Sequence, residues 1–265
     1  QNTNAFNIGR KVVSDPHWVD TIDLYRSGSL ASKPILSSEA LSLIDSISPD
    51  EELRKILEHR TQELIEYQNL SYAKEYMSFV GNIFEKEQKT RSSSELSQNV
   101  AKYLFKLMAT KDEYEVARLS LKAELDSAIN KEFGKSAKIS YMLHPPFLKA
   151  MENIPILNML PGVKSKLALG SWFKVFYVML KNMKFLRGTP FDFMAWFSND
   201  VRKADRKALN HYKSILSNNI DEIGNGKYQD LKEFSILPDI IRGYEEVRLE
   251  TMDEFYLKSN NLFKS

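Results

Sequence analysis

Apolar residues recur every three to four positions over most of the chain, which predicts a mainly α-helical domain. The clearest case runs from Gln98 to Leu119. There Val100, Leu104, Leu107 and Met108 fall on one face of a helix with about 3.6 residues per turn. The pattern predicts one continuous helix over 98–119, with this face turned to the core.

A second long helix is predicted to precede it. Residues 48–51 read Ser-Pro-Asp-Glu, a capping signal with Ser48 at the N-cap and an acidic residue at the third helical position. Apolar residues at helical spacing continue this helix to about Lys86. The polar turn at 90–94 then reverses the chain, so the two helices should form a long antiparallel pair.

The remaining pattern predicts shorter helices and one small β element. Residues 137–143 alternate between apolar and polar, as in a half-buried strand, and two prolines then end it. Residues 171–186 predict a core helix with one wet stripe. Other helices are expected at 39–47, 121–133 and 198–219 and after Pro238. We therefore expect a multi-helix, orthogonal or bundle-like fold with a small β element near 137–143.

A serine-rich connector divides the chain. Residues 27–38 contain a glycine and Pro34 among several serines, which is typical of a link between domains. We expect an N-terminal junction over 1–37 and a mainly helical domain over 38–265. Because the chain begins without Met, inside what already reads as structure, we expect it to be part of a longer protein.

Composition removes several function classes. The 37 basic and 35 acidic residues nearly cancel, which gives no electrostatic reason to expect a nucleic acid or a membrane surface as partner. Cysteine is absent, which excludes disulfides and any iron–sulfur cluster held by this chain alone, and fits a cytoplasmic location. The four histidines fall singly, so no metal site is predicted. No membrane span is visible.

Charged residues enter the core-facing row of the 98–119 helix. Lys111, Glu115 and Arg118 continue the row at i, i+4 and i+7, with Asp112 beside them. One interpretation is a buried ion network that fixes the helix pair; Glu115→Ala should then lower the free energy of unfolding by roughly 3–5 kcal/mol. The other is a cleft shared with another domain, where Lys111 or Arg118 holds a carboxylate or a diphosphate.

Other chemical signals are weaker. His144, beside two prolines, and Arg187, before Gly188, are candidates of the same kind. A cluster of four basic residues at the start of the 198–219 helix favours a solvated face over a phosphate site: Arg202, Lys203, Arg206 and Lys207. No thiamine-binding, glycine-loop or hydrolase motif is present, so we assign no catalytic residue and expect no cofactor on this chain.

Several segments, in order, carry a family resemblance. They read ELIEYQNLSYA, KLMATKDEYEVARL, LHPPFL, GSWFKVF, LRGTPFD and LPDIIRGYEEVR. In this order they resemble the C-terminal region of the long, fused indolepyruvate ferredoxin oxidoreductases, a branch of the 2-oxoacid:ferredoxin oxidoreductases. The start, NAFNIGRKV, resembles the junction after an upstream catalytic domain. The chain departs from the family pattern between Phe147 and Leu169, which is unusually apolar.

The resemblance implies a parent enzyme that oxidatively decarboxylates a 2-oxoacid to an acyl-CoA. That enzyme would use thiamine diphosphate, magnesium and iron–sulfur clusters, all bound by other segments, with ferredoxin and coenzyme A as partners. This chain would be its C-terminal accessory domain, packed on other domains of the same polypeptide and inactive alone. Two alternatives stay open: a free-standing helical interaction or scaffold protein, and a helical nucleic-acid-binding module that uses the basic cluster.

Overall fold

A computed structural model describes residue 10 and residues 35–134, 139–143, 167–192, 194–195 and 199–263. The chain divides into two units, Gln1–Ile35 and Leu36–Ser265, and the second contains every element discussed below. The predicted N-terminal junction and most of the apolar 147–169 segment lie outside the described residues. The described part is mainly α-helical and bundle-like, as predicted, with a single two-stranded sheet among the described residues.

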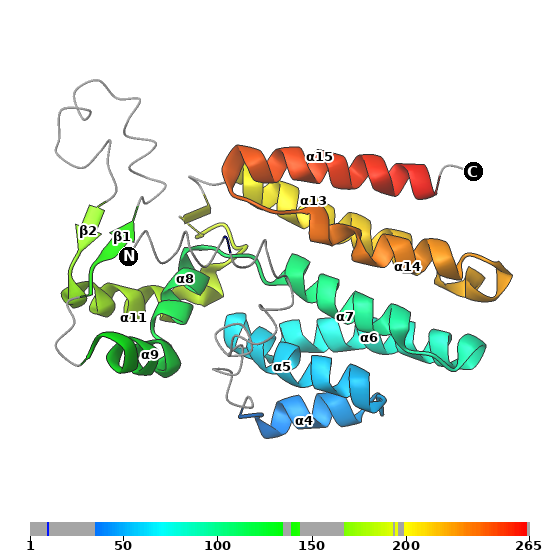
Figure 1. Cartoon of the computed structure of the whole chain (residues 1–265), viewed down its shortest axis with the longest axis horizontal. Helices are drawn as coiled ribbons and strands as arrows, with labels where there is room; N and C mark the ends of the chain where they lie inside the picture. The colour runs from blue at the N-terminus through cyan, green and yellow to red at the C-terminus, as the bar shows by residue number, and fades with distance from the viewer. Residues whose placement is uncertain are drawn as a thin grey trace. The chain divides into compact units, whose positions relative to one another are not determined.

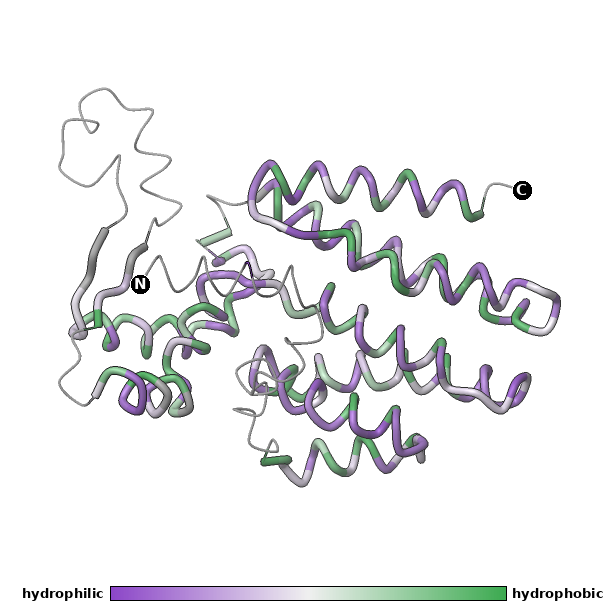
Figure 2. The backbone as a smooth tube through the Cα atoms, in the orientation of Figure 1, coloured by the Kyte–Doolittle hydropathy of each residue, from purple (hydrophilic) through white to green (hydrophobic). Residues whose placement is uncertain are grey.

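Most helices surround one apolar core, here called the large core (Figure 1). They come from both ends of the unit and are α4 (Ser38–Asp45), α5 (Glu51–Tyr67), α6 (Leu70–Arg91), α7 (Glu95–Met108), α13 (Asn199–Asn219), α14 (Tyr228–Ile236) and α15 (Glu245–Leu262). Two 3-10 segments join the last three, η5 (Ile220–Asn225) and η6 (Leu237–Ile240). Figure 2 shows hydrophobic and hydrophilic residues alternating turn by turn along α7 and α13, as expected for helices with one buried face.

The middle of the chain forms a second, smaller core. Its elements are α8 (Glu113–Ser120), α9 (Ala123–Phe133), β1 (Tyr141–Leu143), β2 (Leu167–Leu169), η3 (Ser171–Phe173), α11 (Lys174–Asn182) and η4 (Met183–Leu186). The strands are antiparallel, with Tyr141 opposite Leu169. Tyr114 and Ala117 of α8 pack against Phe173, Tyr177 and Leu180. This small core is separate from the large one, so something other than shared apolar packing must hold the two together.

Both long predicted helices are in fact pairs of helices. The chain breaks at Gln68–Asn69, where the Asn69 side chain accepts a hydrogen bond from the Tyr72 amide at 2.9 Å. It breaks again after Met108, where Asp112 accepts from the Glu115 amide at 2.9 Å. The prediction of unbroken helices was wrong because each break carries an N-cap residue whose side chain satisfies a new helix start. The antiparallel pair itself is formed by α6 and α7.

Two smaller predictions also change. The N-cap of α5 is Asp50, which accepts from the Leu53 amide at 2.9 Å, and not Ser48, which has a left-handed backbone. The described strand is shorter than predicted and begins at Tyr141. Two predicted helix ends are confirmed: α9 stops at Gly134, whose φ of +80° suits glycine, and α13 stops at Asn219.

The predicted core helix over 171–186 is largely exposed. In α11 only Tyr177 and Leu180 are buried, whereas Val175 is 78% exposed and Met179 47%. The prediction was wrong because α11 packs mainly against one neighbour, α8, which covers one side of it. Burial within this fold therefore does not account for the whole apolar composition of α11. Among the described residues, no helix combines the length and the apolar character needed to cross a bilayer.

Candidate functional site

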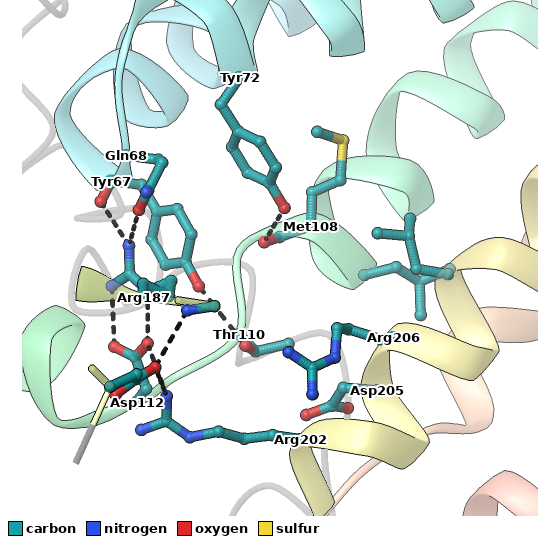
Figure 3. A pocket seen from close by; sticks show the side chains of 14 residues that line it. Tyr67, Gln68, Tyr72, Met108, Thr110, Asp112, Arg187, Arg202, Asp205 and Arg206 are labelled. Atoms are coloured by element: carbon teal, nitrogen blue, oxygen red, sulfur yellow. Dashed lines mark hydrogen bonds and ion pairs between the residues drawn. The ribbon is translucent and has the colours of Figure 1, made fainter. Parts of the chain in front are cut away.

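A cavity of about 320 Å³ lies where the two cores meet (Figure 3). Four pieces of chain line it: the α5–α6 junction, the connection from α7 to α8, the turn after η4 and the first half of α13. The first two pieces are the helix breaks described above. The site therefore exists because Asn69 and Asp112 stop the two long helices that the sequence pattern predicts.

Arg187 connects the two cores through its contacts with Tyr67, Gln68 and Asp112, a set of contacts here called the Arg187 junction. It follows η4 and donates from Nη1 to the Tyr67 carbonyl and to Gln68 Oε1, both at 2.7 Å. Its guanidinium also lies 3.8 Å from the centre of the Tyr67 ring, within cation–π range. Arg187 thereby satisfies the end of α5, where carbonyl groups lack partners within the helix.

Asp112 is the counter-ion of Arg187. The guanidinium donates through Nε to Asp112 Oδ2 and through Nη2 to Oδ1 at 2.9 Å, a bidentate arrangement. Because Oδ1 also accepts the Glu115 amide, one carboxylate both caps α8 and neutralises a largely buried cation. Burial lowers the pKa of Arg187, but the hydrogen bonds to Asp112, together with the electrostatic effects of Tyr67, Asp112 and Glu115, raise it by more, so the guanidinium stays charged.

A second ion cluster lies on the far side of Asp112. Arg202 donates from Nη1 to Asp192 Oδ2 at 3.0 Å and pairs through Nη2 with Glu113. Asp192 is only 1% exposed and accepts three more hydrogen bonds, from the Tyr114 hydroxyl at 2.9 Å and the Gly188 and Ala195 amides at 3.1 and 3.2 Å. The sequence placed Arg202 on a solvated basic face, which is wrong for this residue, although the other three basics are exposed.

Glu115 and Arg118 form a third cluster. Arg118, 5% exposed, donates to Glu115 from Nε and from Nη2, both at 2.8 Å, and reaches Glu63 and Glu66 of α5 at 2.5 and 2.7 Å. Burial lowers the pKa of Arg118, but the hydrogen bonds to Glu115 and Glu63 and the charges of these carboxylates raise it by more, so the pKa is raised overall. Lys111 lies exposed before α8, and among the described residues it has no ion pair, because the helix does not extend to it.

Glu115→Ala should therefore lower the free energy of unfolding by less than the buried ion network predicted from the sequence implies. Arg118 keeps Glu63 and Glu66 as partners, so we expect the free energy of unfolding to fall by about 1.5–3 kcal/mol, the range for a hydrogen bond to a charged group. Urea unfolding of wild type and variant measures this. Unchanged stability with lost activity in a larger assembly would instead place Glu115 in a shared cleft.

The three clusters were only partly visible in the sequence. Asp112, Glu115 and Arg118 share one local pattern, and Arg187 stood out beside its turn. Glu63, Glu66 and Asp192 were missed because their arginine partners lie 10 to 55 residues away in the chain. His144 lies outside the described residues. The described residues contain no group of three His, Asp or Glu side chains placed to hold a metal ion.

Comparison with known proteins gives one match. No curated protein and no solved structure matches the chain. A family model does match, over residues 53–260, and its description is a family of unknown function, DUF6537. This span includes every residue that lines the cavity and covers more than half of the chain. The chain therefore belongs to the DUF6537 family.

Proposed function

We propose that this chain is a helical accessory domain of a thiamine-dependent 2-oxoacid:ferredoxin oxidoreductase of the indolepyruvate type. In this role it packs on the catalytic domains of the same polypeptide and has no activity alone. The parent enzyme would be cytoplasmic and would convert a 2-oxoacid to an acyl-CoA while ferredoxin accepts the electrons.

One observation carries the proposal. Three of the segments that resemble the oxidoreductases meet at the Arg187 junction: ELIEYQNLSYA supplies Tyr67 and Gln68, KLMATKDEYEVARL supplies Asp112, and LRGTPFD supplies Arg187. A resemblance spread over separate segments is more specific when those segments build one structural unit. That unit is an ion-paired brace between two cores, which suits a domain whose task is to hold a shape.

The residues at the junction do not fit the parent enzyme's own cofactors. A magnesium–diphosphate site needs oxygen ligands that are free to bind the metal. Here Asp112, Asp192 and Asp205 are paired with Arg187, Arg202 and Arg248. As part of the proposal, thiamine diphosphate, magnesium, the iron–sulfur clusters, coenzyme A and ferredoxin bind to other domains.

The proposal predicts a silent domain with an active neighbour. The purified chain, supplied with indolepyruvate, thiamine diphosphate, magnesium, coenzyme A and ferredoxin, should reduce no ferredoxin. The coding sequence upstream of Gln1 should continue in frame into thiamine-binding sequence. Turnover by the chain alone would contradict the silent role. A start codon just before Gln1 would favour the free-standing scaffold instead.

The nucleic-acid alternative has a separate test. It relies on a basic face to which Arg202 does not contribute, because the Arg202 side chain pairs with Asp192 and Glu113. Binding through the remaining basic residues would weaken steeply as salt is raised. A mobility-shift assay at low salt that detects no complex would remove this alternative.

A further inference from the structure

The cavity contains hydroxyl groups whose hydrogen bonds to the cavity walls are few and long. Tyr67 is 3% exposed, yet its hydroxyl has one partner, Thr110 Oγ1, at 3.5 Å, which is long for two hydroxyls. Burial raises the pKa of Tyr67 to about 12, so the hydroxyl stays protonated near neutral pH. Only one of the two hydroxyls can donate to the other. At least one O–H therefore has no acceptor within the described walls.

Arg206 adds a cation to the same space. Each carboxylate that lines the cavity already has an arginine partner: Asp112 has Arg187, Asp192 has Arg202, and Asp205 has Arg248 at 2.6 Å. Arg206 also lines the cavity, and among the described residues no carboxylate pairs with it. Figure 3 shows its guanidinium on the Thr110 side of the cavity. The three arginines and three aspartates of the lining balance in number, but Arg206 is the arginine among them without a carboxylate partner in the described residues, and it lies beside two hydroxyls.

Part of the lining is apolar. It consists of the Tyr72 ring, Leu107, Met108 and Leu209. The Tyr72 hydroxyl donates to the Met108 carbonyl at 3.0 Å and is therefore not free to bind a ligand. A volume of about 320 Å³ lies at the lower end of the range for small-molecule sites, which are mostly apolar with a few polar groups. Such sites also favour the boundary between two packed units.

We propose that this cavity binds a small molecule with one carboxylate and a compact apolar body. The carboxylate would accept from Arg206 and from the Tyr67 or Thr110 hydroxyl, and the apolar body would contact Leu107 and Leu209. A single guanidinium without a carboxylate partner favours a monoanion, because a dianion would leave one charge unmatched in a partly apolar space. The inference is independent of the role proposed above, since it concerns only this chain.

Titration calorimetry with 3-phenylpropanoate tests the site, with the uncharged 3-phenylpropanamide and inorganic phosphate as comparisons. We expect the carboxylate to bind at least tenfold more tightly than either. Arg206→Gln should weaken its binding at least tenfold. Because Arg206 is exposed, this variant should fold normally, which circular dichroism can verify. Tyr67→Phe keeps the ring beneath Arg187 and should weaken binding severalfold.

Lys203→Gln is the matched control, since Lys203 is an exposed basic residue on the same helix that does not line the cavity. It should leave binding unchanged. Equal binding of the acid and the amide, or an Arg206→Gln variant that binds as wild type does, would overturn the proposal. Phosphate binding as tight as that of the carboxylate would overturn the apolar part of it. A crystal soaked with 3-phenylpropanoate that shows only water in the cavity would also refute it.

Discussion

Asp112→Ala is expected to lower the free energy of unfolding by about 3–5 kcal/mol, the range for breaking a buried ion pair from one side. The substitution removes the bidentate partner of Arg187, whose guanidinium stays enclosed between the Tyr67 ring and the α5 carbonyl end. It also removes the N-cap of α8, because Asp112 Oδ1 accepts the Glu115 amide. Urea unfolding followed by circular dichroism measures the change.

Two further variants separate the charge from the cap. Asp112→Asn keeps a side-chain oxygen that can cap α8 but removes the negative charge, so its loss of stability should be smaller than that of Asp112→Ala. Asp45→Ala removes a carboxylate that pairs with Arg54 at the surface, and it should change stability little. If Asp112→Ala unfolds at the same urea concentration as Asp45→Ala, the Arg187 junction does not hold the cores together.

Glu87→Ala should have a comparable effect for a different reason. Glu87 is fully buried in α6, and its carboxylate accepts the Leu96 and Ser97 amides at 2.9 and 2.8 Å, the Ser97 hydroxyl at 2.6 Å and the Tyr228 hydroxyl at 2.8 Å. It thus caps α7 from the preceding helix, because Ser94 at the N-cap position makes no side-chain cap bond. Alanine would leave four donors without this acceptor and cost about 3–5 kcal/mol.

The charge and the geometry of Glu87 can be tested apart. Glu87→Gln offers one acceptor oxygen and an NH₂ group that faces donors, so it should recover only a minor part of the loss. Glu85→Ala, two residues earlier on the same helix, removes a surface carboxylate paired with Lys89 and should have little effect. Thermal unfolding of the three variants ranks them, and equal melting temperatures for Glu85→Ala and Glu87→Ala would contradict this account.

Helical periodicity predicted the fold class and several helix ends, because burial of one face imposes the same period wherever it occurs. It failed at Asn69 and Asp112, where a helical spacing continues across a break, with charged residues in the row after Met108. The sequence did carry a local signal at Asp112, an N-cap residue with Glu115 three positions later, but the same glutamate also fits an i,i+4 pair with Lys111. A period cannot decide between two such local solutions.

The site was less predictable than the fold, because its partners are distant in the chain. Arg187 lies 75 residues from Asp112 and 119 from Gln68, and Glu87 meets Tyr228 across 141 residues. From local pattern alone, Arg202 looked like one of four solvated basics. In the folded chain Arg202 pairs with Asp192. No local sequence pattern predicts that Asp192 is buried.

The joint between the two cores has an evolutionary consequence. Within either core, one aliphatic side chain can replace another if the neighbours repack, so such changes can accumulate singly. At the joint, Asp112 and Arg187 are matched by charge, as are Glu63 and Arg118, and a change at Asp112, Arg118 or Arg187 removes the counter-ion of a buried partner. Relatives of this protein should therefore vary freely within each core but change these charged positions in pairs.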